Sequence, residues 1–188
     1  MPVQAVSRRF TVSEYYRMVE AGIISEDDRV ELIQGEVIEM APIGSRHAAC
    51  VNRLSQLFHD VGTGEFIVSV QNPVHLGERS EPQPDLCVLN RRADYYAESH
   101  PGPGDVLLLV EVADSSAEYD REIKVPLYGR AGIRESWLVL LDDGVVEVYR
   151  EPSPEGYREM HKFVQGEELS AGFKPDQTLQ IDDFLPAN

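Results

Sequence analysis

The sequence predicts one α/β (α+β) domain in which a mixed β-sheet is flanked by helices. Strand-like and helix-like segments alternate without the regular βαβ period of a doubly wound fold, and hairpins precede and follow the central part of the chain. The chain has 188 residues, of which 42% are apolar, and this is enough for one substantial core but short for two. Residues 1–188 are therefore expected to form a single domain.

A helix, a hairpin and a second helix are expected in the first third of the chain. The first amphipathic helix is predicted over Ser13–Ala21, and RVELIQGEVIEM is typical of two short alternating strands joined at Gln34-Gly35. The second helix is predicted from Ser45, as its cap, to about Asp60, with Gly62 as a stop. Its apolar residues recur at helical spacing: Val51, Leu54, Leu57, Phe58 and Val61.

Strands dominate the middle of the chain. Three apolar segments have the length and the β-branched content of strands, and the last two are expected to be buried: Phe66–Val70, Asp85–Leu89 and Val106–Val112. The stretch NRRADYYAESHPGPGD between the last two is expected to be a surface excursion.

The last third predicts a helix followed by strands. A helix is expected over Glu118–Ala131, ended by Gly132. Strands follow at Ser136–Leu141 and Val145–Arg150, with a turn at Asp143-Gly144, and the tail is expected to add two more short strands.

The composition limits the classes of function. With 17 Lys and Arg against 33 Asp and Glu, the formal charge of −16 weighs against a general nucleic-acid binder. It does not exclude an enzyme that acts on nucleic acid, because a bound cation and a few arginines reverse the field locally. The start of the chain lacks the apolar middle of a signal peptide, and no apolar run reaches the length of a membrane span. We expect a cytoplasmic protein without a membrane partner, in which the well-separated Cys50 and Cys87 are small core residues.

An acidic residue inside an apolar strand is the most informative chemical feature. Glu111 lies within VLLLVEVA, where an inward charge needs a partner, and Asp85 begins the apolar strand of QPDLCVL. If the two strands are neighbours, both carboxylates meet at one edge of the sheet and repel unless a proton or a cation lies between them. Oxygen ligands favour a hard ion, Mg²⁺ or Mn²⁺.

Two alternatives to this metal site are structural. Glu111 can face solvent on a half-exposed strand, or pair with an arginine. Asp120 and Lys124 are four residues apart on one helix face, so the ammonium can reach back to the carboxylates, although such a pair alone is usually a surface ion pair.

Several blocks together resemble one family. VELIQGEVIEMAP, GSRHAACVNRL, QPDLCVL and LLLVEVADSSAEYDREIKVPLYGRAGIRESWLVLL are similar in order, spacing and flanking residues to the Uma2-like (DUF820) family of the PD-(D/E)XK superfamily. The resemblance implies a restriction-endonuclease-like mixed sheet. It also implies that Asp85 and Glu111 bind the metal and that Glu31 joins the site.

The chain departs from the superfamily pattern two residues after Glu111, where Ala113 replaces the expected lysine. The resemblance implies that Lys124 supplies the catalytic cation from the following helix, and Asp120, one turn before it, is a candidate substrate contact. His47 matches a family histidine and is a candidate substrate contact, the alternative being a capping or surface role. Tyr128 and Trp137 also match family positions but are interpreted as core packing. Candidate phosphate contacts, each with ordinary surface charge as the alternative, are Arg46, Arg53, Arg91, Arg92 and Arg121.

The function implied is that of a Mg²⁺- or Mn²⁺-dependent endonuclease that hydrolyses the phosphodiester bonds of nucleic acid, with DNA as the expected substrate. A homodimer is expected by analogy with superfamily nucleases that pair two active sites to cut both strands. The main rival is a non-catalytic module that keeps the nuclease fold for partner binding or assembly. A third hypothesis keeps the metal but replaces nucleic acid with another phosphate ester.

Overall fold

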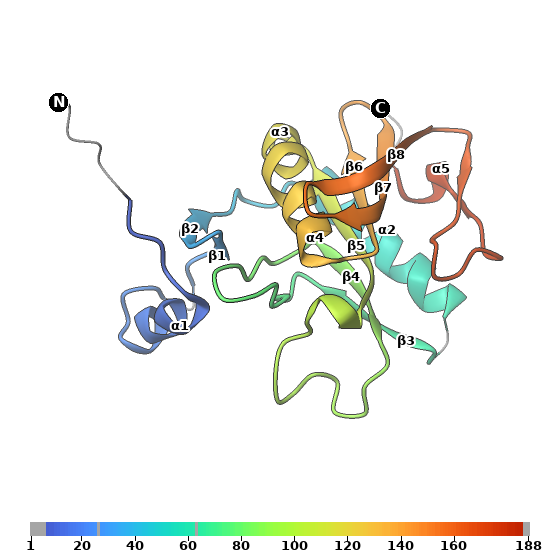
Figure 1. Ribbon diagram of the computed structural model, residues 1–188. Helices are drawn as coiled ribbons and strands as arrows, with labels where there is room; N and C mark the ends of the chain where they lie inside the picture. Colours follow the sequence, from blue (N-terminus) through green and yellow to red (C-terminus); the bar gives the residue numbers. More distant parts are fainter. Residues whose placement is uncertain (1–6, 26, 63, 186–188) are drawn as a thin grey trace.

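A six-stranded mixed sheet runs through the computed structural model, which describes residues 7–25, 27–62 and 64–185 (Figure 1). Neighbouring strands are antiparallel except for β5 and β6, which are parallel. The spatial order is β3 (Phe66–Val70), β4 (Leu86–Asn90), β5 (Val106–Ala113), β6 (Glu135–Leu140), β7 (Val145–Ser153) and β8 (Gly156–Val164). The predicted fold class, a mixed sheet flanked by helices, is confirmed. The first six residues, which contain part of the segment considered for a signal peptide, lie outside the described residues.

The helix α2 (Ser45–Val61) covers one face of the sheet. Alternate residues of a strand point to opposite faces, and Val110 and Val112 of β5 share a core cluster with Leu54 and Phe58 of α2. Gly62 ends the helix as predicted. The prediction that Ser45 is the cap is wrong, because Gly44 occupies that position and makes no side-chain capping hydrogen bond.

The opposite face is covered by the helical segment between β5 and β6. Its parts are α3 (Ala117–Tyr119), the π-helical turn η2 (Asp120–Lys124) and α4 (Val125–Ala131). Tyr128 and Ile133 pack on Leu109 of β5. Glu111 is two residues after Leu109 and therefore points to the same helical side of the sheet.

The π-helical turn corrects the prediction of one regular helix over Glu118–Ala131. The N–H of Val125 bonds to the carbonyl of Asp120, five residues earlier, as in a π-helix. Pro126 has no N–H to donate, and its ring would clash with the carbonyl four residues before it in a regular helix. The wider turn removes this conflict and places Asp120 and Lys124 on the side that faces the sheet, where both are buried.

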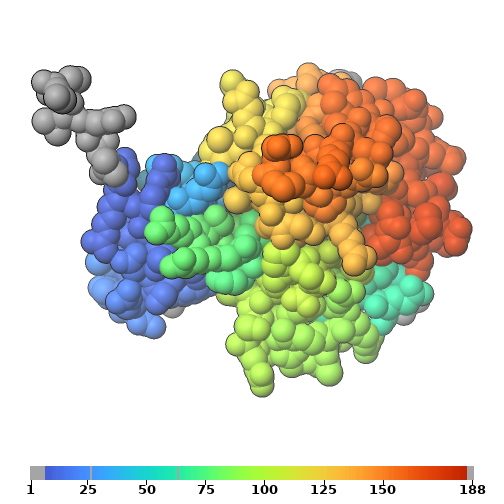
Figure 2. Space-filling view, in the orientation of Figure 1, coloured from blue at the N-terminus to red at the C-terminus, as the bar shows by residue number. Residues whose placement is uncertain are grey.

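A small N-terminal lobe holds α1 (Val12–Glu20) and a hairpin of β1 (Val30–Ile33) and β2 (Glu36–Glu39), and Figure 2 shows it beside the main body. The predicted hairpin is confirmed, with Gly35 at φ 82° in the turn. The lobe is joined to the segment before β4 by backbone hydrogen bonds from Gly35 to Arg79 and from Glu81 to Leu32, of 2.7 and 2.8 Å. These bonds position β1, and with it Glu31, beside the sheet.

The tail contains the two short strands that were expected, β9 (Glu168–Leu169) and β10 (Leu179–Gln180), and in addition a long strand that was not expected. The nine-residue strand β8 extends the main sheet as its edge, and two further pairs of residues form a separate small sheet. Cys50 and Cys87 are buried free thiols, as predicted. Within the described ranges, no helix is both long and apolar enough to cross a bilayer. The remaining elements are η1 (Pro103–Asp105) and α5 (Ile181–Phe184).

A substitution at Gly129 of α4 can test how closely the helical segment packs against the sheet at Gly156 of β8. A Cβ atom at this position would lie 2.3 Å from the backbone oxygen of Gly156, so Gly129→Ala must displace α4. We expect the free energy of unfolding to fall by about 1–3 kcal/mol in urea denaturation, the usual cost of overpacking. Gly104→Ala is the matched control, because a Cβ there meets nothing within 4 Å. Equal stabilities of the two variants would contradict the close packing.

The buried carboxylate of Glu147 in β7 is expected to make a pH-dependent contribution to the free energy of unfolding. Burial alone would raise its pKa, but hydrogen bonds from Arg121, Tyr149 and Lys162 outweigh burial and lower the pKa below its usual value. A carboxyl group with a lowered folded pKa stabilises the protein above its unfolded pKa of about 4.5, and this contribution is lost as the pH falls through the folded pKa. We expect Glu147→Gln to unfold with ~1 kcal/mol less free energy at pH 7, a value reduced for the partly exposed Arg121 and Lys162. Denaturation at pH 7 and pH 3 should show this difference shrinking, and a constant difference would contradict the assignment.

Candidate active site

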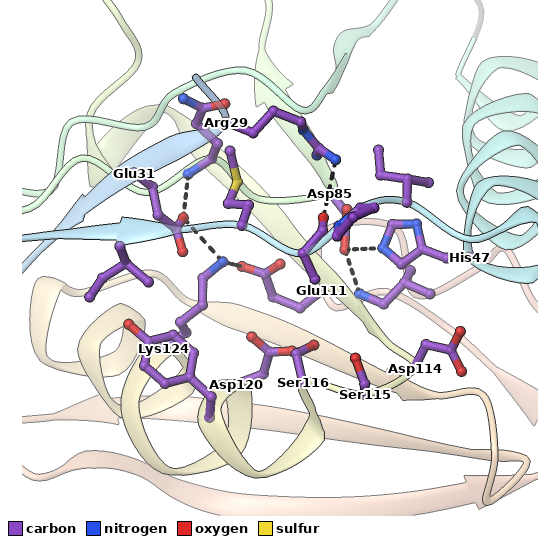
Figure 3. Close-up of a pocket in the computed structure, with 18 of the residues that line it drawn as sticks. Arg29, Glu31, His47, Asp85, Glu111, Asp114, Ser115, Ser116, Asp120 and Lys124 are labelled. Carbon is purple, nitrogen blue, oxygen red and sulfur yellow. Dashed lines mark hydrogen bonds and ion pairs between the residues drawn. The ribbon is translucent and has the colours of Figure 1, made fainter. Parts of the chain in front are cut away.

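A cavity of about 430 Å³ lies where the N-terminus of α2, the strand β1, the start of β4, the end of β5 and the π-helical turn meet (Figure 3). The strands β4 and β5 are direct neighbours, so the predicted convergence of Asp85 and Glu111 at one end of the sheet is found in the structure. The titratable residues that line the cavity come from every one of these elements. They are Arg29, Glu31, Glu39, His47, Asp85, Glu111, Asp114, Tyr119, Asp120 and Lys124.

Lys124 connects the carboxylates of two separate strands. Its Nζ lies 2.9 Å from Oε1 of Glu111 and 3.3 Å from Oε2 of Glu31, and all three side chains are at most 7% exposed. Burial alone would lower the pKa of Lys124, but the charges of Glu111 and Glu31 outweigh burial and raise it. This direction favours the ammonium form, whose contacts with Glu31 and Glu111 join the N-terminal hairpin to the sheet.

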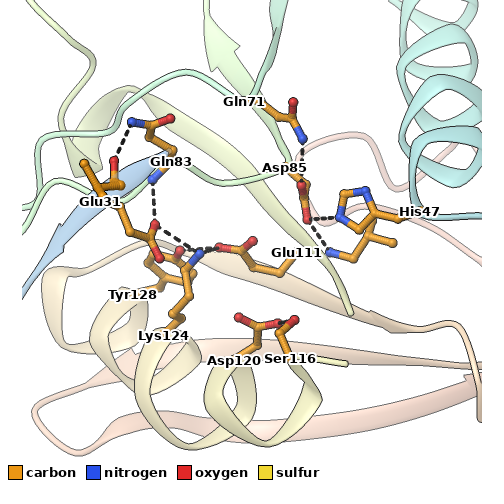
Figure 4. A network of polar contacts seen from close by, with 12 residues as sticks. Glu31, His47, Gln71, Gln83, Asp85, Glu111, Ser116, Asp120, Lys124 and Tyr128 are labelled. Carbon is orange, nitrogen blue, oxygen red and sulfur yellow. Dashed lines mark hydrogen bonds and ion pairs between the residues drawn. The ribbon is translucent and has the colours of Figure 1, made fainter. Parts of the chain in front are cut away.

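Glu111 is the most perturbed carboxyl group of the cavity. Burial, followed by the nearby carboxylates of Asp120, Asp85 and Glu31, raises its pKa to about 8 in spite of the opposing charge of Lys124. The phenol of the fully buried Tyr128 donates a hydrogen bond to Oε1 of Glu111, the same oxygen that Lys124 contacts (Figure 4). Because Tyr128 and Lys124 both contact Oε1, the carboxyl group of Glu111 is held in one orientation.

Asp85 is held by backbone and side-chain donors. Its Oδ2 accepts a hydrogen bond of 2.9 Å from the N–H of Val112, and its Oδ1 accepts one of 3.2 Å from Nε2 of Gln71. Nε2 of His47 lies 2.9 Å from the same Oδ2. This contact raises the pKa of His47 and outweighs the opposing effect of burial. His47, in the first turn of α2, thus lies in the cavity wall rather than on the surface.

The carboxyl group of Asp120 lies in the cavity wall, on the π-helical turn. It is 5% exposed, and burial raises its pKa in spite of the charge of Lys124 and a hydrogen bond from Ser116. Six carboxyl groups therefore line the cavity, which also contains the buried ammonium of Lys124 and the guanidinium of Arg29. Oxygen donors in this number suit a hard divalent ion.

The described residues do not form a preorganised metal-binding site. Among them, no three His, Cys, Asp or Glu side chains are grouped as ligands for one ion. Lys124 lies between two of the three carboxylates expected to bind metal, Glu31 and Glu111, while the third, Asp85, contacts His47. The metal ligand set drawn from the resemblance therefore stays a prediction.

The sequence-predicted residues separate into two groups. Glu31, His47, Asp85, Glu111, Asp120 and Lys124 all line the cavity. Arg46, a candidate substrate contact, is not among the lining residues; it bonds to Asp142 and to the carbonyl of Leu141 beyond β6, at 2.9 and 3.0 Å. Two other candidate phosphate contacts, Arg121 and Arg92, are ion-paired with Glu147 and Asp94. Arg46 thus lies outside the cavity lining, and its expected contact with substrate stays a prediction.

Among the titratable and amide side chains that line the cavity, those not predicted from the sequence are Arg29, Glu39, Gln83, Asp114 and Tyr119. Arg29 and Gln83 each stand two residues before an expected ligand, Glu31 and Asp85, and alternation along an extended chain was a usable signal. The interpretation of Tyr128 as core packing is incomplete, because its ring packs in the core while its hydroxyl group binds Glu111. Trp137 is buried as expected, with its indole N–H bonded to Glu135.

Comparisons with known proteins agree with this arrangement. Residues 12–182 match the Uma2 family, described as "Putative restriction endonuclease". A solved structure, a "putative nuclease belonging to DUF820" from Anabaena variabilis ATCC 29413, superposes on 94% of this chain and 97% of that chain. Its TM-score is 0.72 at 16% sequence identity, which shows a shared fold. The search of curated proteins returns no match. Because the family match covers most of the chain and every residue of the cavity, the chain belongs to the Uma2 family.

Proposed function

We propose that this protein is a metal-dependent endonuclease that hydrolyses phosphodiester bonds of DNA in the cavity between β1, β5 and the π-helical turn. The observation that carries the proposal is the meeting of Asp85 and Glu111 from neighbouring strands with the buried ammonium of Lys124. Family membership supports the reaction class.

The donor set fits Mg²⁺ or Mn²⁺. Mg²⁺ is usually held by one or two carboxylates together with water and substrate phosphate, so Asp85 and Glu111 suffice, with Glu31 as a third oxygen donor. Burial is the main cause that raises the pKa of Glu111, and the nearby carboxylates of Asp120, Asp85 and Glu31 add to it in spite of Lys124. An added cation would stabilise the charged form of this carboxyl group. When bound, the metal would polarise the phosphate and lower the pKa of a water molecule.

The chain supplies its own groups for the phosphate. Arg29 lies at the cavity with its Nη1 bonded to the carbonyl of Ala41 at 3.1 Å, and it is exposed to solvent. Gly44 and His47 bring the N-terminus of the 17-residue helix α2 to the same cavity. A helix N-terminus and a guanidinium group both favour an anion, and Lys124 can stabilise negative charge that develops on the phosphoryl oxygens.

Asp85→Asn and Glu111→Gln test the metal and the chemistry together. We expect both variants to lose Mg²⁺- or Mn²⁺-dependent cleavage of plasmid and oligonucleotide DNA while keeping the far-ultraviolet circular dichroism of the wild type. In thermal melts, Mg²⁺ and Mn²⁺ should raise the Tm of the wild type with increasing concentration, because a ligand of the native state stabilises it. Asp85→Asn should remove this shift, and the exposed Asp176→Asn should keep it.

The outcomes of these measurements separate the competing functions. Cleavage by Asp85→Asn at the wild-type rate would refute the assignment of the site. A wild-type protein that neither responds to metal nor cleaves DNA would favour a non-catalytic binding module. A metal response without cleavage of DNA or RNA would favour another phosphate ester as the substrate.

Tyr128→Phe tests whether the phenol positions Glu111. The change removes one hydroxyl group that bonds to Oε1 of Glu111 and leaves the buried ring in place. Partners that orient a metal ligand typically contribute about 10–100-fold in metal affinity or activity. We therefore expect a higher metal concentration for half-maximal cleavage, measured by titration at fixed DNA concentration. Tyr157→Phe is the matched control, since it removes a phenol that bonds to Ser136 away from the cavity. Equal metal requirements in both variants would assign Tyr128 to packing alone.

A further inference from the structure

A second cavity, of about 290 Å³, lies on the other side of β1 from the candidate active site. Val30 lines this second cavity, and the next residue, Glu31, lines the first. Gln83 lines both: its N–H bonds to Oε2 of Glu31 at 3.0 Å, and its side-chain amide bonds to the carbonyl of Val30 at 3.2 Å (Figure 4). Consecutive Cα atoms are about 3.8 Å apart, and Val30 and Glu31 are consecutive residues of β1. The strand β1 alone therefore separates the two cavities at this point.

Aromatic rings form the walls of this second cavity. The rings of Tyr16 and His100 are 16° from parallel with centroids 6.5 Å apart, and both side chains are exposed to solvent. The buried Tyr15 packs edge-on against Tyr16 at 5.6 Å. Exposed, nearly parallel rings of this kind are the surfaces on which nucleobases stack.

Buried polar contacts fix the ring of Tyr16. Its hydroxyl group donates a hydrogen bond to Oε1 of Glu81, which is 4% exposed, and Nδ1 of His75 lies 3.0 Å from the other oxygen of Glu81. The carbonyl of Pro101, next to His100, accepts a hydrogen bond of 2.9 Å from the N–H of His75. The same cluster therefore links both aromatic walls, and the ring of Tyr16 is held in place without a ligand.

Both cavities contain carboxylates, but they differ in whether a Lys or Arg side chain lines them. The first contains Arg29 and Lys124, which suit a phosphate group. Among the described residues that line the second, none is Lys or Arg, and the lining instead combines aromatic and aliphatic side chains with Asp28, Glu81 and Gln83. This surface repels phosphate, but it can stack a flat ring and accept hydrogen bonds from its edge.

From this arrangement we infer that the second cavity binds one unpaired nucleobase of the nucleic acid whose phosphate lies in the first. The inference rests on the proposed nuclease function and adds to it the substrate class: a single strand, or a nucleotide turned out of a duplex. Tyr16 and His100 supply the stacking surfaces. The carboxylate of Asp28, an acceptor, favours bases that carry an amino group, which are adenine, cytosine and guanine rather than thymine.

The test measures binding of short single strands without cleavage. Fluorescence anisotropy in the presence of EDTA gives the Kd of the full-length protein for a labelled deoxycytidine decamer and for an abasic sugar-phosphate decamer of the same length. We expect Tyr16→Leu to weaken binding of the deoxycytidine decamer about tenfold, the contribution of one base–aromatic stack. Binding of the abasic decamer should be unchanged.

Two further variants serve as controls. Tyr16→Phe keeps the ring and removes the hydroxyl group that bonds to Glu81, so it should bind the deoxycytidine decamer within about twofold of the wild type if stacking is the interaction. Tyr95→Leu removes a tyrosine that is 68% exposed and lines neither cavity, and it should behave as the wild type. Melting temperatures of all variants show whether each remains folded.

The alternatives give different results. If the wild type binds both decamers with equal Kd and Tyr16→Leu changes neither, the base site is refuted while a nucleic-acid substrate stands. If the wild type binds neither decamer, the base site is refuted together with the single-strand substrate, and cleavage assays on duplex DNA decide the proposed function separately. Equal losses in Tyr16→Leu and Tyr95→Leu would also refute a specific site.

Discussion

The buried ammonium of Lys124 is the interaction on which the site depends. It contacts Glu31 from the N-terminal hairpin and Glu111 from the central sheet, while itself belonging to the helical segment on the sheet's far side. Removing one partner of a buried ion pair leaves an uncompensated charge and typically costs about 3–5 kcal/mol, so the three elements are bound to one geometry. The same contacts of Lys124 hold the carboxylates of Glu31 and Glu111 close together, so its ammonium group also fixes the geometry of the site.

The π-helical turn makes this contact compatible with the rest of the helix. Pro126 prevents a regular helix between Glu122 and itself, and the widened turn ends at Lys124, directly before α4. On the far side of α4, Gly129 lets the helix approach the backbone of Gly156 closely. One local irregularity and one missing side chain therefore set how far the helical segment lies from Glu111.

The strong negative charge of the chain is compatible with the proposed nucleic-acid substrate because of the local arrangement of charges in the cavity. Three of the five arginines predicted as candidate phosphate contacts bond to other residues: Arg121 pairs with Glu147, Arg92 with Asp94, and Arg46 bonds to Asp142. The cavity itself combines Arg29, Lys124 and the N-terminus of α2. A net charge describes the field at long range, whereas a phosphate inside the cavity is governed by the groups that it touches.

The fold class, the hairpin around Gly35, the two buried strands and the meeting of Asp85 with Glu111 could be predicted from the residues alone, whereas Glu31 was added to the site by the resemblance to the Uma2-like family. The predictions made from the residues follow from local periodicity, turn chemistry and the cost of placing an acid in an apolar strand, all of which are properties of neighbouring residues. Only the tertiary structure decided that Tyr128 binds Glu111, that Lys124 lies between two carboxylates, and that Arg46 lies outside the cavity while Arg29 lies within it. These contacts join residues from separate elements, and their partners depend on how the hairpin, the sheet and the π-helical turn pack together, which periodicity does not encode.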